Sequence, residues 1–70
     1  MSIHDRARLA LIKARKEGRR ILFLVRWGTY EDGRPAYMSI PRKEYKEEQD
    51  AYVQTWVDGD FRNTNKIEKI

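Results

Sequence analysis

The side chains with the greatest capacity for chemistry in this 70-residue sequence are basic, and more than half of them stand within its first 28 residues. Arg8 and Arg15 are seven residues apart, and Arg6 and Lys13 repeat this spacing. Residues seven apart share one side of a helix, so these four side chains are predicted to form two parallel rows. Guanidinium and ammonium groups spread in this way bind phosphates and carboxylates through charge-assisted hydrogen bonds.

The net charge of +4 is divided unevenly along the chain. Residues 1–28 hold eight Lys or Arg against two Asp or Glu, which gives +6, whereas residues 29–70 carry −2. This asymmetry predicts an acidic partner or a nucleic acid and carries no information on the fold. Exposed aromatic side chains near a turn would add interface anchors or base stacking. The candidate contact residues are therefore Arg6, Arg8, Lys13, Arg15, Arg19, Arg20, Trp27, Tyr30 and Tyr37.

The sequence offers no set of residues typical of catalysis, of a cofactor or of a metal site. It contains no cysteine, and His4 is its only histidine, so it lacks the usual nucleophile–base pairs and histidine clusters. Acidic residues within 44–50 interleave with lysines at helical spacing, which is typical of a solvated helix face. Residues 58–60 lack the further ligands of a calcium loop. We therefore predict a protein without enzymatic activity, cofactor or metal.

A helix is predicted over residues 3–17. Ser2 can cap its N-terminus with Asp5 in the first turn, and Gly18 is a natural residue to end it. Each residue of an α-helix is rotated by about 100° from the one before, which places five apolar side chains of this segment on one stripe. This stripe comprises Ile3, Ala7, Ala10, Leu11 and Ala14.

Leu9 and Ile12 fall on the other side of the predicted helix. We expect them to widen its buried face, which is the commoner arrangement. Otherwise they form an exposed apolar pair that a partner covers.

A β-hairpin is predicted to follow the helix. Residues 20–27 alternate in the manner of a strand, with apolar side chains on both faces, which indicates a central strand. Residues 28–35 contain the turn signal Asp32-Gly33, and residues 36–40 fit a short return strand. The loop of this hairpin is therefore longer than two residues.

A second amphipathic helix is predicted over residues 42–57, because Pro41 suits a first helical turn and Tyr45 continues at helical spacing into Val57. The β-branched and aromatic content of residues 52–57 leaves a strand as the alternative there. Residues 61–70 form a tail that docks as an edge strand or as a last helical turn. The fold class is thus α+β, a single domain over residues 1–70 in α-β-β-α order with a possible C-terminal edge strand.

No membrane-spanning segment is predicted. The longest apolar run, residues 21–25, is far shorter than the roughly 20 residues of a spanning helix or the about 7 to 15 of a signal-peptide core. We expect the protein to stay soluble in the cytoplasm, and the lack of cysteine fits a reducing compartment. Because two strands form a poor core, we expect either that both helices cover the sheet or that the sheet is extended by the tail or by a second copy of the chain, as a homodimer.

Two functions fit these features. The first is a protein-binding factor that docks on a larger protein or nucleoprotein complex and blocks or redirects it. Compact chains of this size without catalytic groups or a strong nucleic-acid motif are often accessory proteins or inhibitors encoded by phages or mobile elements. A viral or mobile-element protein of this type is therefore one hypothesis. The second is sequence-nonspecific binding of DNA or RNA by the same basic helix.

Overall fold

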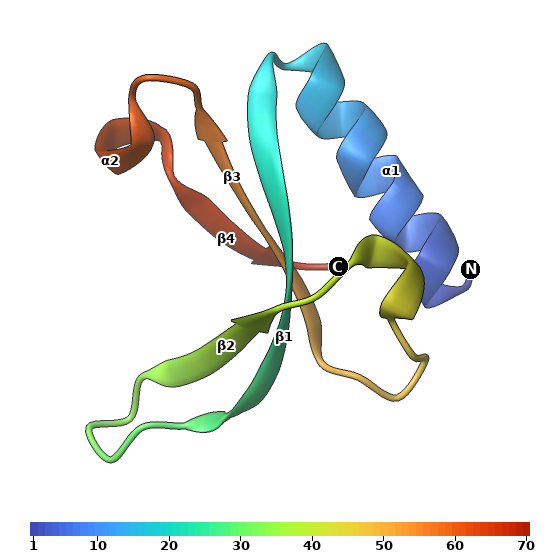
Figure 1. The fold of residues 1–70 in the computed structure, drawn as a ribbon, viewed down its shortest axis with the longest axis vertical. Helices are drawn as coiled ribbons and strands as arrows, with labels where there is room; N and C mark the ends of the chain where they lie inside the picture. The colour runs from blue at the N-terminus through green and yellow to red at the C-terminus, as the bar shows by residue number, and fades with distance from the viewer.

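A four-stranded antiparallel sheet with one long helix on one of its faces forms the architecture of residues 1–70 in the computed structural model (Figure 1). The strands lie in the order β2-β1-β3-β4, so β1 and β3 are central. The α+β class is confirmed. The elements in chain order are α1 (Ile3–Lys16), β1 (Arg19–Thr29), β2 (Pro35–Ser39), the 3-10 turn η1 (Arg42–Glu44), β3 (Ala51–Val57), α2 (Phe61–Thr64) and β4 (Lys66–Lys69).

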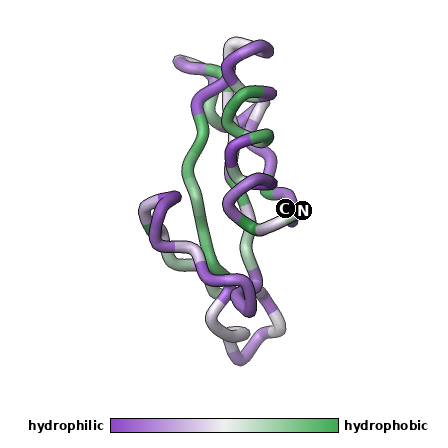
Figure 2. Tube along the Cα trace, turned by 90° about the vertical axis from the view of Figure 1, so that its right-hand side faces the viewer, coloured by the Kyte–Doolittle hydropathy of each residue, from purple (hydrophilic) through white to green (hydrophobic).

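Helix α1 begins and ends as its capping residues predict. The Ser2 hydroxyl oxygen accepts a hydrogen bond from the Asp5 amide at 3.2 Å, which satisfies one of the free N–H groups of the first turn. Gly18 follows with a φ of +67°, a left-handed conformation that glycine adopts without steric cost. Figure 2 views this side of the molecule, where hydrophobic and hydrophilic segments alternate along α1.

Strand β1 pairs with different neighbours along its length. Its first part, Arg19 to Val25, pairs with β3, and its second part, Leu24 to Thr29, pairs with β2. A register shift between Arg26 and Gly28 bends β1 in the part that pairs only with β2. The sheet therefore opens into two arms, the β1–β2 hairpin and the segment that contains β3, α2 and β4 (Figure 1).

The prediction of a second helix over residues 42–57 is wrong. Only η1 is helical there, and Ala51–Val57 form strand β3 between β1 and β4. The spacing that suggested a helix joined Tyr45, which lies in a loop, to an alternating strand. The β-branched and aromatic side chains of β3 pack well on a pleated surface, and both edges of the strand find hydrogen-bonding partners. The helix that does follow, α2, has four residues.

The C-terminal tail docks as an edge strand, which is one of the two alternatives predicted for it. Strand β4 pairs with β3 from Thr55↔Lys66 to Tyr52↔Lys69, and the Ile70 amide donates to the Ala51 carbonyl oxygen at 3.1 Å. The sheet is therefore extended by the chain itself. None of the helices is long and apolar enough to cross a membrane.

The core lies between α1 and the sheet. Its buried members are Ile3, Ala7, Val25, Tyr45 and Ala51, with Phe23, Ile40 and Ile70 packed against them. Small alanine side chains on α1 allow the helix to approach the strands closely. Tyr45 is 3% exposed, and its hydroxyl lies 2.9 Å and 2.8 Å from two carbonyl oxygens, those of Leu24 and Tyr52. Burial raises the pKa of Tyr45 to about 12, because an anion would lose its hydration there.

Candidate functional site

The outward face of α1 is the surface of the helix that points away from the sheet. Its side chains are exposed because α1 buries Ile3, Ala7 and Ala14 against the strands and no element covers its other side. Leu9 is 51% exposed and Ile12 46% exposed. The expectation that this pair widens the buried face is wrong, because the molecule has no second layer to receive it. Leu9 and Ile12 instead form an exposed apolar pair, which was the alternative prediction.

The basic side chains of α1 surround this apolar pair. At about 100° per residue, Leu9 and Ile12 lie opposite the buried stripe of the helix. The two basic rows lie on either side of the pair, and all four of their side chains are exposed. One row consists of Arg8 and Arg15, and the other consists of Arg6 and Lys13.

The cations on α1 have no acidic partner within the molecule. The three ion pairs of the structure join Arg20 to Asp58 at 3.1 Å, Arg34 to Asp32 at 2.6 Å and Lys69 to Asp50 at 3.4 Å, so none involves the helix. The outward face of α1 thus combines the apolar pair with unpaired positive charge on both of its sides. The exposed Asp5 and Lys16 lie in line with the pair, in the first and last turns of the helix. Such a surface can bind carboxylates or phosphates without first breaking internal ion pairs.

Arg19 has a structural position, although it belongs to the predicted contact residues. Its Nε donates to the Thr55 hydroxyl oxygen at 3.1 Å, and its Nη2 donates to the carbonyl oxygens of Thr55 and Thr64. The half-buried guanidinium therefore ties β1 to β3 and to the end of α2. Arg20 is exposed and pairs with Asp58, an arrangement that stabilises a fold little.

The predicted aromatic residues lie on the hairpin arm, away from α1 (Figure 1). Trp27 is 66% exposed beside the bulge of β1. Tyr30 is exposed at the turn, with the Arg34 guanidinium carbon 5.6 Å from its ring centre. Tyr37 packs edge-to-face on Tyr52, with ring centres 5.1 Å apart. The structure thus separates the predicted contact residues into two groups instead of joining them in one surface.

The face of the sheet opposite α1 is a second surface, which we term the open face. The register of the strands places Leu22, Leu24, Tyr37, Tyr52, Trp56 and Ile67 on it, and Phe61 of α2 packs on Trp56 at 5.6 Å between ring centres. Leu22 is 37% exposed, and Ile67 and Phe61 are more so. The sequence prediction missed Tyr52 and Trp56 on this face because β3 was assigned to a helix. The alternation of residues 52–57 is the signal that could have found them.

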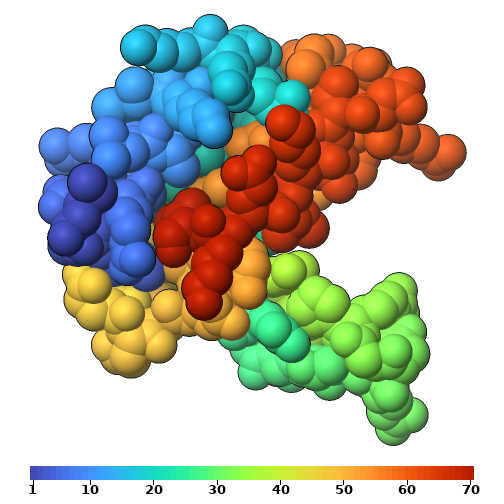
Figure 3. Space-filling view, turned by 180° about the vertical axis from the view of Figure 1, so that it is seen from behind, coloured from blue at the N-terminus to red at the C-terminus, as the bar shows by residue number.

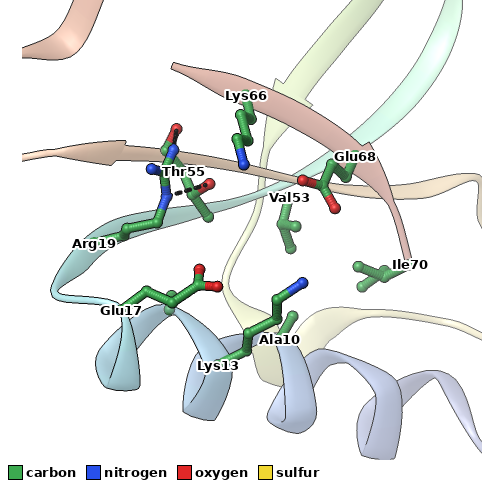
Figure 4. Close-up of a pocket in the computed structure, with 10 residues that line it drawn as sticks. Ala10, Lys13, Glu17, Arg19, Val53, Thr55, Lys66, Glu68 and Ile70 are labelled. Atoms are coloured by element: carbon green, nitrogen blue, oxygen red, sulfur yellow. Dashed lines mark hydrogen bonds between the residues drawn. The ribbon is translucent and has the colours of Figure 1, made fainter. Parts of the chain in front are cut away.

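A small pocket lies between α1 and the strands β3 and β4 (Figure 4). Lys13 and Glu17 line it from the helix, and Lys66 and Glu68 line it from β4. Its volume is about 80 Å³, far below the roughly 300 Å³ at which ligand sites of small molecules begin. Its opposite charges are also nearly balanced. We therefore regard it as the seam between helix and sheet.

No group of three or more His, Cys, Asp or Glu side chains is close enough together to hold a metal ion. His4 is exposed in the first turn of α1. Comparisons with protein-family models, with characterised proteins and with solved structures found no match to this chain. The choice between the predicted functions therefore depends on the chemistry of the two surfaces.

Proposed function

We propose that this chain is a non-catalytic protein-binding factor that docks on an acidic surface of a larger protein through the outward face of α1. One observation carries the proposal: Leu9 and Ile12 are exposed in the middle of four basic side chains that have no ion-pair partner. An apolar centre surrounded by a polar rim is the usual anatomy of a protein–protein interface.

The apolar pair favours a protein over a nucleic acid as the partner. A phosphate backbone would attract the basic rows, but it has no apolar group for Leu9 and Ile12 to contact. A protein groove with apolar walls and an acidic border satisfies both kinds of side chain at once. Sequence-nonspecific binding of DNA or RNA remains the second candidate, supported by the charge of +6 on residues 1–28.

The form of the helix supports a blocking or redirecting role. Helix α1 has 14 residues and is therefore about 21 Å long. It is held rigidly on the sheet by its buried stripe, so its binding surface is already formed before association, which lowers the entropic cost of docking. A helix that lies in a groove of its partner excludes any other ligand of that groove.

A capture experiment with matched variants tests the proposal. The tagged protein is incubated with nuclease-treated lysate of its host, and three double variants are compared with it. We expect Arg8→Glu with Arg15→Glu, and separately Leu9→Ser with Ile12→Ser, to lose the partner. Arg34→Glu with Arg62→Glu makes the same charge change outside α1 and should retain it. A partner that both α1 variants still bind would contradict the proposal.

A salt titration separates the two candidate functions. Labelled DNA and RNA are titrated with the protein between about 50 and about 200 mM salt, the range over which phosphate contacts lose most of their affinity. We expect binding weaker than micromolar. Submicromolar binding with a steep salt dependence, lost in the charge variant but kept in the Leu9→Ser and Ile12→Ser variant, would replace the protein-binding proposal with nucleic-acid binding.

A further inference from the structure

The open face and the hairpin arm hold most of the exposed apolar surface of the molecule. Of the nine large hydrophobic side chains that are exposed, two lie on the outward face of α1 and one is the N-terminal methionine. The other six lie on the open face or on the hairpin: Leu22, Trp27, Tyr30, Met38, Phe61 and Ile67. Small proteins rarely leave so much contiguous apolar surface without a partner.

Met38 pairs with Val25 of the core and so lies on the α1 side of the sheet. The other five residues are arranged around a notch. Figure 3 shows it as the opening between the hairpin, in green, and the segment of β3, α2 and β4, in orange and red. The notch exists because the two parts of β1 pair with different strands and diverge at the bulge beside Trp27. One aromatic pair, Tyr37 with Tyr52, stands toward the hairpin, and the pair of Trp56 with Phe61 stands toward α2.

Several polar side chains around the open face have partners within the chain. Arg20 and Lys69 each have a carboxylate partner there. Gln54 donates to the Asn65 side-chain oxygen at 2.8 Å, and the Arg26 guanidinium donates to the Thr29 hydroxyl oxygen at 2.9 Å. This rim carries fewer unpaired cations than the outward face of α1 and therefore attracts an acidic protein or a phosphate backbone less. It suits a partner surface that is apolar and locally neutral.

We propose that the occupant of the notch is a second copy of this chain, with the hairpin arm of each copy seated in the notch of the other. A two-fold interface requires a surface that is complementary to itself. This molecule supplies both halves, because the arm that bounds the notch also presents Trp27 and Tyr30 as exposed apolar side chains.

The distribution of charge permits this association although each chain carries +4. The unpaired cations of α1 lie on the other side of the sheet from the notch. Arg26 of β1 and Arg62 of α2 also have no ion pair, and they are matched in number by the unpaired Glu31 of the hairpin and Asp60 beside α2. The charges of the surfaces brought together therefore nearly balance, and salt screens interactions beyond about 8 to 10 Å under ordinary conditions. The dimer goes beyond the proposed function and does not depend on it. It leaves both α1 helices on the outside, so a dimer could engage two acidic sites at once.

Analytical ultracentrifugation of the full chain tests the dimer. Between about 1 and about 500 µM, the mass should rise from the 8.4 kDa of one chain toward twice that value, as mass action requires. We expect Leu22→Glu, in the notch, and Trp27→Asp, on the arm, each to raise the dissociation constant at least about tenfold, as loss of an interface anchor does. Leu9→Glu introduces the same charge on α1 and should leave the constant unchanged.

Two results would overturn the inference. One is a monomeric mass at every concentration; the other is a dimer that Leu9→Glu breaks and Trp27→Asp does not. Thermal unfolding at low concentration checks that the variants fold, and Trp27→Asp keeps the test decisive if Leu22→Glu unfolds, since Trp27 makes few contacts within the chain.

The geometry is tested by spin labelling, which the cysteine-free chain makes simple. The Tyr30→Cys variant carries a spin label and is mixed with an isotopically labelled copy that has none. We expect broadening of the NMR signals of Phe61 and Ile67 in the second copy. Broadening restricted to residues of α1 would contradict the seating of the hairpin in the notch.

Discussion

The two faces of the sheet differ in what covers them. The central strand β1 nevertheless has apolar side chains on both faces. Phe23 and Val25 of β1 point toward α1 and pack with the core. Leu22 and Leu24 point to the open face, where no helix lies; Leu24 is nevertheless buried, whereas Leu22 is 37% exposed. Hydrophobicity of a strand therefore does not decide by itself which of its residues are buried. The side chains and elements that pack on each face also decide it, and here a single helix of useful length covers one face.

The two exposed surfaces differ in charge as well. On the outward face of α1 the cations have no internal partner, whereas on the open face Arg20 and Lys69 are neutralised by Asp58 and Asp50. Unpaired charge increases the rate at which an oppositely charged protein associates and selects for it. Paired charge around an apolar surface leaves selection to shape and packing. The two surfaces thus suit two different partners, an acidic protein and a second copy of the chain.

The largest expected effect is the difference in stability between a substitution on the buried face of α1 and one on its outward face. Ile3 is fully buried against the sheet, so Ile3→Ala should lower the free energy of unfolding by about 3 kcal/mol, through lost burial and a residual cavity. Leu9→Ala is the matched control on the same helix. It should change stability by less than about 0.5 kcal/mol, because Leu9 is half exposed and alanine favours the helix. Urea unfolding measures both. Equal losses would show that α1 is buried on both sides.

Alkaline pH should lower the stability of the fold through Tyr45, which is buried in the core between α1 and the sheet. The pKa of this tyrosine is about 12 in the folded protein and about 10 when unfolded, so the folded state holds the proton more tightly. The stabilisation is complete below pH 10 and is lost as the pH rises toward 12, by up to about 1.4 kcal/mol per pH unit. Unfolding measured from pH 8 to 12 should show this fall.

The Tyr45→Phe variant identifies the source of that pH dependence. It should be less stable at pH 8 by about 1 kcal/mol, because it leaves the carbonyl oxygens of Leu24 and Tyr52 without the hydroxyl. It should also lose the steepest part of the alkaline fall. Tyr30→Phe, at an exposed tyrosine, controls for the deletion of a hydroxyl. If the two variants give the same slope as the wild type, Tyr45 does not cause the fall.

Local signals in the sequence were sufficient for α1 and the hairpin. Capping residues such as Ser2 and Gly18 act through their own neighbours, so they can be recognised without a structure. The hairpin was predicted from alternation and from the turn signal Asp32-Gly33, and its strands begin and end within one residue or two of the prediction. The C-terminal edge strand was one of two alternatives for the tail and is confirmed.

The remaining features depend on contacts between distant parts of the chain. Strand β3 forms because β1 and β4 pair with it, which the spacing of Tyr45 and Trp56 concealed. Arg19 was predicted as a contact residue from its charge, but its acceptors come from Thr55 and Thr64, far along the chain. Likewise, nothing local indicates that the open face has no covering layer. Propensity and periodicity cannot supply such long-range information.

The smallest expected effect sharpens the comparison between the two faces of the sheet. Leu22 is 37% exposed on the open face, and threonine suits a strand, so Leu22→Thr should change the stability of the monomer by less than about 0.5 kcal/mol at micromolar concentration. At several hundred micromolar, a dimer adds binding energy to the folded wild type that the variant lacks, so the difference between them should grow with concentration. Thermal unfolding at both concentrations measures it. If the difference in stability between Leu22→Thr and the wild type does not change with concentration, no second copy covers Leu22. If the variant already loses much of its stability at micromolar concentration, the open face belongs to the core of the single chain.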